Sequence, residues 1–146
     1  MAQTTTRTNN SELASALRLS LLRAARRLRL QRVHTELTLS QLSALSSVRK
    51  HGPMSAGEVA SIERVQPPSM TKILSSLEGG GWIARTAHAE DRRQSVISIT
   101  EEGIRLLDED TRARDEWLAS QLQRFSTEEC DVLSKAIDVL DRLGSG

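Results

Sequence analysis

Two adjacent arginines, Arg92 and Arg93, stand in a short charged segment between two stretches that have the alternation of β-strands, residues 82–85 and 95–100. Guanidinium groups on an exposed hairpin are unusual packing residues. They pair well with phosphate and fit the narrow minor groove of DNA. We therefore expect this loop to contact DNA if the hairpin is the wing of a winged helix.

The segment before the hairpin predicts a helix over residues 67–78, which begins with two prolines and ends at three glycines. Ile73, Leu74 and Leu77 give it an inner face, and most other residues are polar. Their hydroxyl, amide and amine groups suit base edges or phosphates, although capping or ordinary surface roles fit each serine and threonine nearly as well. The candidate DNA contacts here are Gln66, Pro68, Ser69, Met70, Thr71, Lys72 and Ser75.

Three further residues complete the candidate interface. Ser55 opens a Ser-Ala-Gly-Glu capping box before a short helix over residues 55–63, and it is a candidate phosphate donor. Arg85, at the base of the hairpin, either contacts phosphate or closes an ion pair. Asp91 is expected to brace the loop by holding an arginine or a backbone amide, because a carboxylate repels phosphate. One of the two loop arginines is then structural, while the other probes the groove.

Long apolar helices are predicted on both sides of this region, from residue 11 to about residue 35 and in two segments that begin at Thr100 and Ser126. They carry more apolar surface than a thin monomer covers, which predicts self-association. The alternative is that they close one monomeric core. The candidate dimerisation residues are Leu13, Leu17, Leu21, Leu118, Leu122, Leu133, Ile137 and Leu140.

These elements predict a mainly α fold with a small β-hairpin wing, that is, a winged helix-turn-helix plus a terminal-helix dimerisation region. Another capping box, Thr38 with Gln41, starts a helix that ends near His51. The expected segments are a disordered tail (residues 1–10), an N-terminal dimerisation helix (11–37), the winged helix-turn-helix (38–100) and C-terminal dimerisation helices (101–146).

Composition is compatible with this organisation. The chain has 146 residues, 38% of them hydrophobic and 27% charged, and its net charge of +1 conceals +5 in residues 1–48, +2 in 49–100 and −6 in 101–146. The acidic C-terminal part is therefore not expected to face DNA. We see no apolar run long enough for a membrane span and no signal peptide, so we expect a cytoplasmic protein without a membrane partner.

Little else in the chain suggests reaction chemistry. The three histidines lie on separate elements, the chain has one cysteine, and no catalytic triad or phosphate-cradling glycine loop is recognisable. We therefore expect no enzyme, no metal and no cofactor. Cys130 lies near a helix start, but Glu128, Glu129 and Asp131 oppose thiolate formation, which favours an inert thiol over a redox switch.

Three motifs in order give this chain a resemblance to the multiple-antibiotic-resistance-regulator (MarR) family of winged-helix transcription factors. They are Leu77-Glu78-Gly79-Gly80-Gly81-Trp82-Ile83-Ala84-Arg85, then Asp91-Arg92-Arg93, then Ile99-Thr100-Glu101-Glu102-Gly103. The resemblance spans residues 11–143. It departs at the triple glycine, where the family more often has charged residues before one glycine.

The resemblance implies a homodimer in which the first helix and the last two helices interleave between subunits. It further implies binding of double-stranded, pseudo-palindromic DNA and repression that is released by a small, often aromatic, anionic ligand. The candidate walls of that ligand site are the arginine-rich first helix and residues 38–50. The alternatives are a winged-helix adaptor that binds protein instead of DNA, and a redox-responsive regulator that acts through Cys130.

Overall fold

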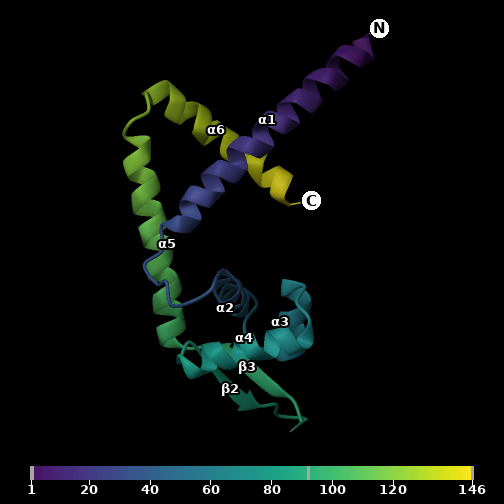
Figure 1. The fold of residues 1–146 in the computed structure, drawn as a ribbon, viewed down its shortest axis with the longest axis vertical. Coiled ribbons are helices and arrows are strands. Elements are labelled where there is room, and N and C mark those ends of the chain that lie inside the picture. The colour runs from purple at the N-terminus through teal and green to yellow at the C-terminus, as the bar shows by residue number, and fades with distance from the viewer. Residues whose placement is uncertain (1, 92, 146) are drawn as a thin grey trace. The chain divides into compact units, whose positions relative to one another are not determined.

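The computed structural model describes residues 2–91 and 93–145, and only the backbone of residues 2–8. Figure 1 shows a mostly helical chain with one small sheet. The helices are α1 (Ala2–Leu30), α2 (Leu39–His51), α3 (Ala56–Glu63), α4 (Pro67–Gly79), α5 (Glu101–Leu122) and α6 (Thr127–Gly144). The strands are β1 (Met54–Ser55), β2 (Ile83–Ala87) and β3 (Ser95–Ile99). The predicted fold class is confirmed.

The chain divides into two compact units. One, the winged unit, comprises residues 32–112, and the other, the terminal-helix unit, comprises residues 1–31 and 113–146. The winged unit holds α2, α3, α4, the sheet and the first half of α5. The segment boundaries expected from the sequence, after residues 10, 37 and 100, stay predictions.

The sheet has three strands in the order β1-β3-β2, all antiparallel. The β2–β3 pair is the hairpin expected from the sequence, with Arg85 opposite Ile97. The sequence analysis missed β1, in which Met54 pairs with Ile97 and Ser55 with Val96. A strand of two residues has no measurable periodicity, so its existence depends on the partner strand that β3 offers.

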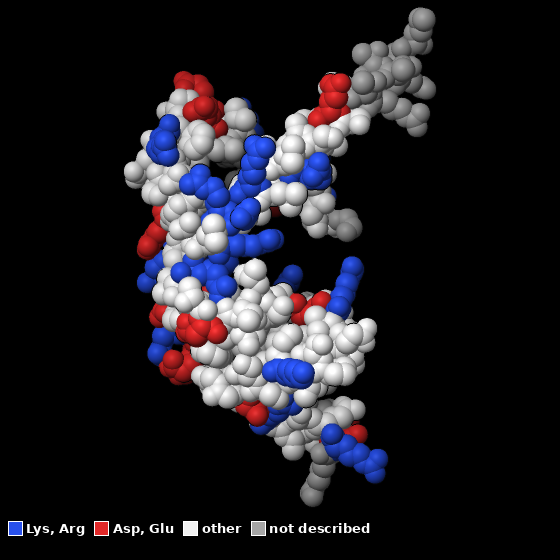
Figure 2. Space-filling model, viewed as in Figure 1, with Lys and Arg blue, Asp and Glu red and all other residues white. Residues whose placement is uncertain are grey.

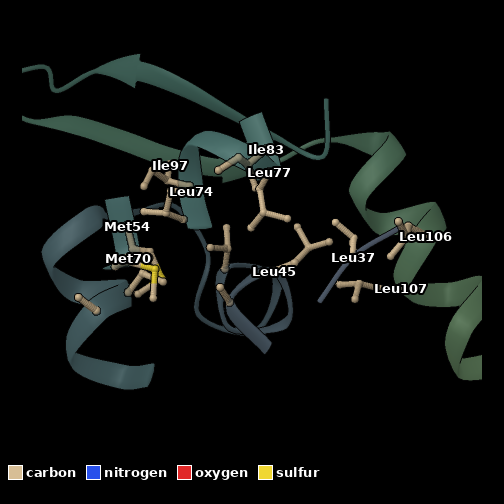
Figure 3. Packing of buried hydrophobic residues seen from close by; sticks show 14 residues of the cluster. Leu37, Leu45, Met54, Met70, Leu74, Leu77, Ile83, Ile97, Leu106 and Leu107 are labelled. Atoms are coloured by element: carbon tan, nitrogen blue, oxygen red, sulfur yellow. The ribbon is translucent and has the colours of Figure 1, made fainter. Parts of the chain in front are cut away.

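The hydrophobic core of the winged unit is formed where α2, α3, α4, the sheet and α5 meet (Figure 3). Leu45, Leu74, Leu77 and Ile97 are completely buried in it. The core fixes α4 against the sheet with one face inward, and this leaves the opposite face of α4 free.

Capping residues set the starts of three helices. The capping boxes expected at Thr38, Ser55 and Ser126 are confirmed, each with its side chain accepting a bond from the amide three residues on and the reciprocal bond also present. Such local bonds depend only on neighbouring residues, and this is why the sequence is enough to predict them.

The C-terminal end of α1 corrects the sequence analysis, because the helix ends at Leu30 instead of near Thr35. The amides of Val33 and His34 donate to Asp110 of α5 instead of to helical carbonyls, and this tertiary contact replaces the last turn. The disordered tail expected at residues 1–10 stays a prediction.

The terminal-helix unit has a different surface from the winged unit. Among the described residues of α6 none is buried, and large apolar side chains are exposed on α1, α5 and α6, including Leu13, Leu21, Leu118, Leu133 and Ile137. The remaining candidate dimerisation residues, Leu17, Leu122 and Leu140, are half-buried. In the same unit, the guanidinium of Arg27 lies 5.2 Å from the ring centre of Trp117, a cation–π contact between α1 and α5.

Candidate nucleic-acid interface

The exposed face of α4 carries most of the residues that the sequence analysis selected. Met70, Leu74 and Leu77 anchor the helix in the core, whereas Pro68, Ser69, Thr71, Lys72 and Ser75 are exposed. The structure therefore gathers hydroxyls and one ammonium group on a single free helical face. These groups have the donor and acceptor types that read base edges and phosphates in a major groove.

Met70 is a correction to the predicted contacts. Its side chain is 1% exposed and packs in the core (Figure 3), so it is not available to a ligand of the outer face. The sequence did contain the signal, because Met70 precedes Leu74 by four residues and Leu77 by seven, the spacing of one helical stripe.

The N-terminus of α4 is open to an anion. Pro67 and Pro68 occupy the first two helical positions and have no N–H to offer, while the amide of Met70 already donates to the carbonyl of Gln66 at 3.0 Å. Ser69 is the third residue of α4, where a helix amide has no intrahelical partner, and the exposed Gln66 side chain makes no capping bond. The helix dipole adds partial positive charge at this end.

Thr71 has a more restricted role than the sequence suggested. Its hydroxyl donates to the backbone carbonyl of Pro67 at 2.9 Å, one turn back in α4. The hydroxyl proton is therefore engaged within the helix. The side chain is left to offer its methyl group, which suits contact with a thymine methyl.

Helix α3 precedes α4 across a tight turn, in which Arg64 adopts a left-handed conformation with φ of 54°. Ser55 caps α3 by accepting a bond from the amide of Glu58 at 3.2 Å. A hydroxyl that accepts in this way still has its proton to donate, so the predicted phosphate contact remains chemically available at Ser55.

At the base of the wing, the geometry favours the second of the two roles proposed for Arg85. Its Nε atom lies 3.0 Å from Oε2 of Glu78, so an ion pair joins β2 to the last turn of α4. Arg85 is half-buried and Glu78 is exposed. The pair therefore links the orientation of the wing to that of α4.

In the wing loop, two polar side chains accept bonds from nearby backbone amides. Oδ1 of Asp91 accepts a bond from the backbone amide of Arg93 at 3.0 Å, and Nδ1 of His88 accepts bonds from the amides of Glu90 and Asp91, each at 3.2 Å. The bond of Asp91 is of the kind that the predicted bracing role requires. Arg93 is exposed, and Arg92 lies outside the described residues.

Basic side chains concentrate on two parts of the molecule (Figure 2). One group lies over α1, which carries Arg18, Arg23, Arg26, Arg27 and Arg29. In the winged unit, the exposed basic side chains of the candidate interface are Lys72 on α4 and Arg93 in the β2–β3 loop.

Two glycines, one in the first motif and one in the last, and a threonine connect these two segments. Gly81 has φ of 82°, a left-handed conformation that starts the turn from α4 into β2. A Cβ on Gly103 would lie 2.3 Å from the carbonyl oxygen of Trp82, so α5 can approach the sheet only with glycine there. Thr100 joins the two, because its hydroxyl donates to the carbonyl of Gly81 at 2.6 Å and accepts from the amide of Gly103 at 3.2 Å.

Other kinds of site are not seen in the described part of the chain. Among residues 2–91 and 93–145, no group of three or more histidine, cysteine, aspartate or glutamate side chains is placed to hold a metal ion. In the same residues, no helix combines the length and apolarity needed to cross a bilayer. Cys130 is half-buried on α6, with its Sγ atom 3.9 Å from the carbonyl oxygen of Leu122.

Comparisons with known proteins agree on one family. The MarR family model matches residues 37–95. An HTH-type transcriptional regulator of Mycobacterium bovis is 40% identical over 132 residues, which cover 90% of this chain and 92% of the relative. The HTH-type transcriptional repressor MdtR of Bacillus subtilis is 37% identical over 92 residues, 63% of this chain and 59% of that protein.

Solved structures give the same result for the fold. A crystal structure of a Pseudomonas aeruginosa protein described as a transcriptional regulator superposes with a TM-score of 0.83 at 28% identity. The match covers 95% of this chain and 97% of that one.

Proposed function

This chain belongs to the MarR family of winged-helix transcriptional regulators, and on that premise we propose that it is a homodimeric repressor of pseudo-palindromic operators. In this proposal α4 enters the major groove, and the wing reaches the adjacent minor groove or its phosphates. A small, often aromatic, anionic ligand releases the protein from DNA.

The observation that carries the proposal is the division of α4 into two faces. Three apolar side chains hold the helix in the core, and the opposite face presents Ser69, Lys72 and Ser75 to the surface. A helix that follows a tight turn and is held in this way has the geometry of a recognition helix. The open N-terminus at Ser69 adds a place for a phosphate.

The wing supports the minor-groove part of the proposal. Asp91 accepts a bond from the backbone amide of Arg93, and His88 accepts bonds from the amides of Glu90 and Asp91. Local bonds of this kind reduce the conformational freedom that Arg93 would lose on binding. Arg92 is the second arginine of the proposed contact, and the double substitution described below tests the two together.

The terminal-helix unit supports the dimer. Its exposed leucines and isoleucine lie on α1, α5 and α6, and an open apolar groove between α1 and α6 is lined by residues that include Leu13, Leu17 and Leu143. Apolar surface of this kind is typical of an interface between subunits. Two winged units in a symmetric dimer would read two half-sites about one helical turn, roughly 10 base pairs, apart.

Two observations support the proposal of repression that a ligand releases: the description of a relative and the charge of α1. MdtR, a relative over part of the chain, is itself described as a repressor. The arginines of α1 give the terminal-helix unit a positive surface that suits an anionic effector. We assign no individual pocket residue to that effector.

Selection of bound fragments from a random duplex library tests the proposal most directly. The expected result is enrichment of a two-fold related pair of half-sites, followed by loss of binding when one half-site is scrambled. Recovery of sequences without symmetry would contradict the dimeric operator. Failure to enrich any duplex at low salt, with folded protein, would contradict DNA binding and favour the adaptor alternative.

A further inference from the structure

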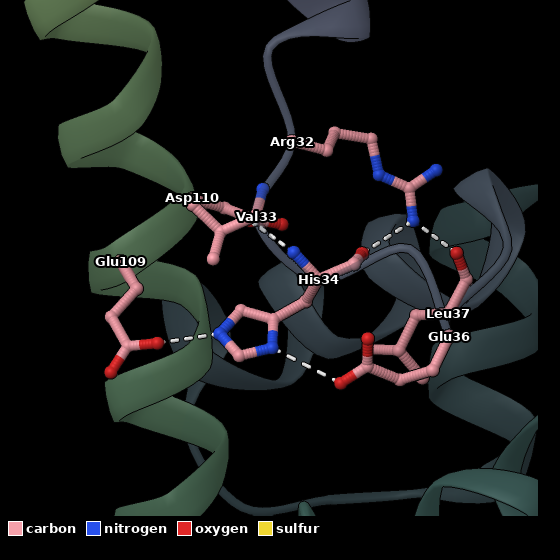
Figure 4. A network of polar contacts seen from close by, with 7 residues as sticks. All are labelled: Arg32, Val33, His34, Glu36, Leu37, Glu109 and Asp110. Atoms are coloured by element: carbon pink, nitrogen blue, oxygen red, sulfur yellow. Dashed lines mark hydrogen bonds and ion pairs between the residues drawn. The ribbon is translucent and has the colours of Figure 1, made fainter.

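The segment that joins α1 to α2 is fastened to α5 by a histidine held between two carboxylates (Figure 4). Nε2 of His34 lies 2.5 Å from Oε2 of Glu109 on α5, and Nδ1 lies 3.0 Å from Oε1 of Glu36 in the same segment as the histidine. The side chain of His34 is 24% exposed, so the cluster is shielded without being closed.

Asp110, the neighbour of Glu109, holds the backbone of the same segment. Its Oδ1 atom accepts bonds from the amides of Val33 at 2.9 Å and His34 at 3.1 Å, although the residue is only 1% exposed. Arg32 then donates to the carbonyls of His34 and Leu37, which shapes the segment on its other side. Next along α5, Asp108 pairs with Arg49 of α2 at 2.7 Å.

This network lies next to the two places where the chain passes between the compact units. The chain passes from one compact unit to the other at residues 31–32 and again at residues 112–113. His34 lies just inside the winged unit at the first crossing, and Glu109 and Asp110 lie just inside it at the second. The network therefore ties together the two segments through which the units are connected.

The hydrogen-bond chemistry of the cluster requires a particular charge state. A carboxylate can only accept, so both ring nitrogens of His34 must donate, and only the protonated imidazolium has two N–H groups. The hydrogen bond to Glu109 raises the pKa of His34 above 6.5, burial partly opposes this, and the bond to Glu36 adds to the rise. The negative charges of Glu36 and Asp110 raise the pKa of His34 further. The positive charge of Arg32 acts on Glu36, whose pKa it helps to lower.

We propose that His34, Glu109 and Asp110 form a proton-dependent clasp that holds the two inter-unit segments together and that loosens as the pH rises. When the ring loses a proton, one of the two carboxylates faces a nitrogen lone pair, and one bond is replaced by repulsion. The segment then loses one side-chain bond, and the bonds from the amides of Val33 and His34 to Asp110 carry more of its attachment to α5. Looser segments give the two units more freedom, and binding to an operator must remove that freedom.

The direction of the pH effect follows from linkage. A group whose pKa is raised in the folded protein stabilises it fully below its unfolded pKa of 6.5 and loses that contribution as pH rises through the raised value. The pKa of Glu36 is lowered by a bond with its own backbone and by the bond from His34, so its contribution is lost as pH falls below its ordinary 4.5. The clasp should therefore be firmest between these limits.

Amide hydrogen exchange on the full-length protein tests the clasp without any DNA. Protection factors at Val33 and His34, which already correct for intrinsic exchange, should fall by about fivefold between pH 6 and pH 8, the size expected for one hydrogen bond. His34→Gln and Glu109→Gln should each remove this pH dependence. His51→Gln, which changes an exposed histidine at the end of α2, should retain it.

The regulatory part of the inference rests on the proposed function, and operator affinity tests it separately. Between pH 6 and pH 8 the wild type should lose several-fold more operator affinity than His34→Gln does. The comparison with the variant corrects for the effect of other titrating groups. Equal losses would overturn the link to DNA binding. Equal protection at both pH values in the wild type, or a pH effect that survives in His34→Gln, would overturn the clasp itself. If no duplex binds at either pH, the proposed function fails while hydrogen exchange still decides the clasp.

Discussion

At the scale of single residues, Lys72 is the lysine of the candidate interface on α4. It is exposed on α4 between Thr71, whose hydroxyl is engaged with the helix backbone, and Ile73, which packs against the core. An ammonium group on a flexible stem reaches phosphate easily but carries little sequence information by itself. We therefore assign Lys72 to affinity more than to specificity.

Lys72→Ala should weaken binding to operator and to unrelated duplex by similar factors. Each lysine that neutralises a phosphate contributes about one unit to the slope of log affinity against log salt, so the slope should fall by about two units for the proposed dimer. Binding measured by fluorescence anisotropy over a salt series checks this. Lys135→Ala on α6 is the matched control, and an unchanged slope in Lys72→Ala would remove this residue from the interface.

At the scale of elements, the wing and α4 are connected by an ion pair and by a tight turn. The ion pair from Arg85 to Glu78 joins β2 to the end of α4, and the turn between them requires the left-handed conformation of Gly81. Asp91 shapes the loop at the far end of the hairpin. The sequence identified all these residues, but only their contacts show that β2 is connected to the end of α4.

Replacing Arg92 and Arg93 together by alanine should reduce operator affinity and flatten its salt dependence, because fewer counterions are released. The fold should be unaffected, because the loop contacts described here use the backbone amide of residue 93 and not its side chain. Anisotropy titrations combined with circular dichroism check both statements. Arg105→Ala, on the exposed face of α5, serves as the control, and equal effects of the two changes would contradict a role for the wing.

Leu74→Ala should destabilise the protein by about 3 kcal/mol, because the removed atoms leave a cavity in a close-packed core. Leu74 is completely buried and lies directly beneath the exposed face of α4. Chemical denaturation gives the change in the free energy of unfolding. Ser75→Ala, one residue along on the exposed face, should change it by less than about 0.5 kcal/mol, and similar values for both would mean that α4 is not anchored as described.

At the scale of the whole molecule, the two units divide the surface by chemistry. The winged unit encloses a continuous apolar core, whereas the terminal-helix unit leaves large apolar side chains exposed on all three of its helices. The acidic residues of the C-terminal part lie on α5 and α6, and the candidate interface lies on α4 and the wing. This distribution suits a protein that associates through its ends and reads DNA through its middle.

Ile137→Glu should convert the proposed dimer into monomer, because it places a charge at an apolar position of α6 that is 56% exposed in the single chain. The monomer should lose cooperative binding to a two-half-site operator while keeping weak binding to one. Sedimentation velocity measures the association. Lys135→Glu, on the opposite side of α6, is the control, and a persisting dimer in Ile137→Glu would place the interface elsewhere.

The sequence by itself determined the features that depend on neighbouring residues. The three capping boxes, the helix-turn-helix, the hairpin and the polar face of α4 follow from local bonds and periodicity, and the fold class was therefore predictable. Met70 could also have been assigned correctly from the sequence, since its spacing from Leu74 marks it as a core residue.

Only the tertiary structure decided features that depend on partners far along the chain. Strand β1 exists because β3 pairs with it, and α1 ends at Leu30 because Asp110 takes the next amides. Asp110 falls on the buried stripe of α5 with Leu106 and Leu107, but no pattern in the sequence indicates which groups this aspartate and His34 bind. Their partners lie more than 70 residues apart in sequence, and chain folding alone brings them together.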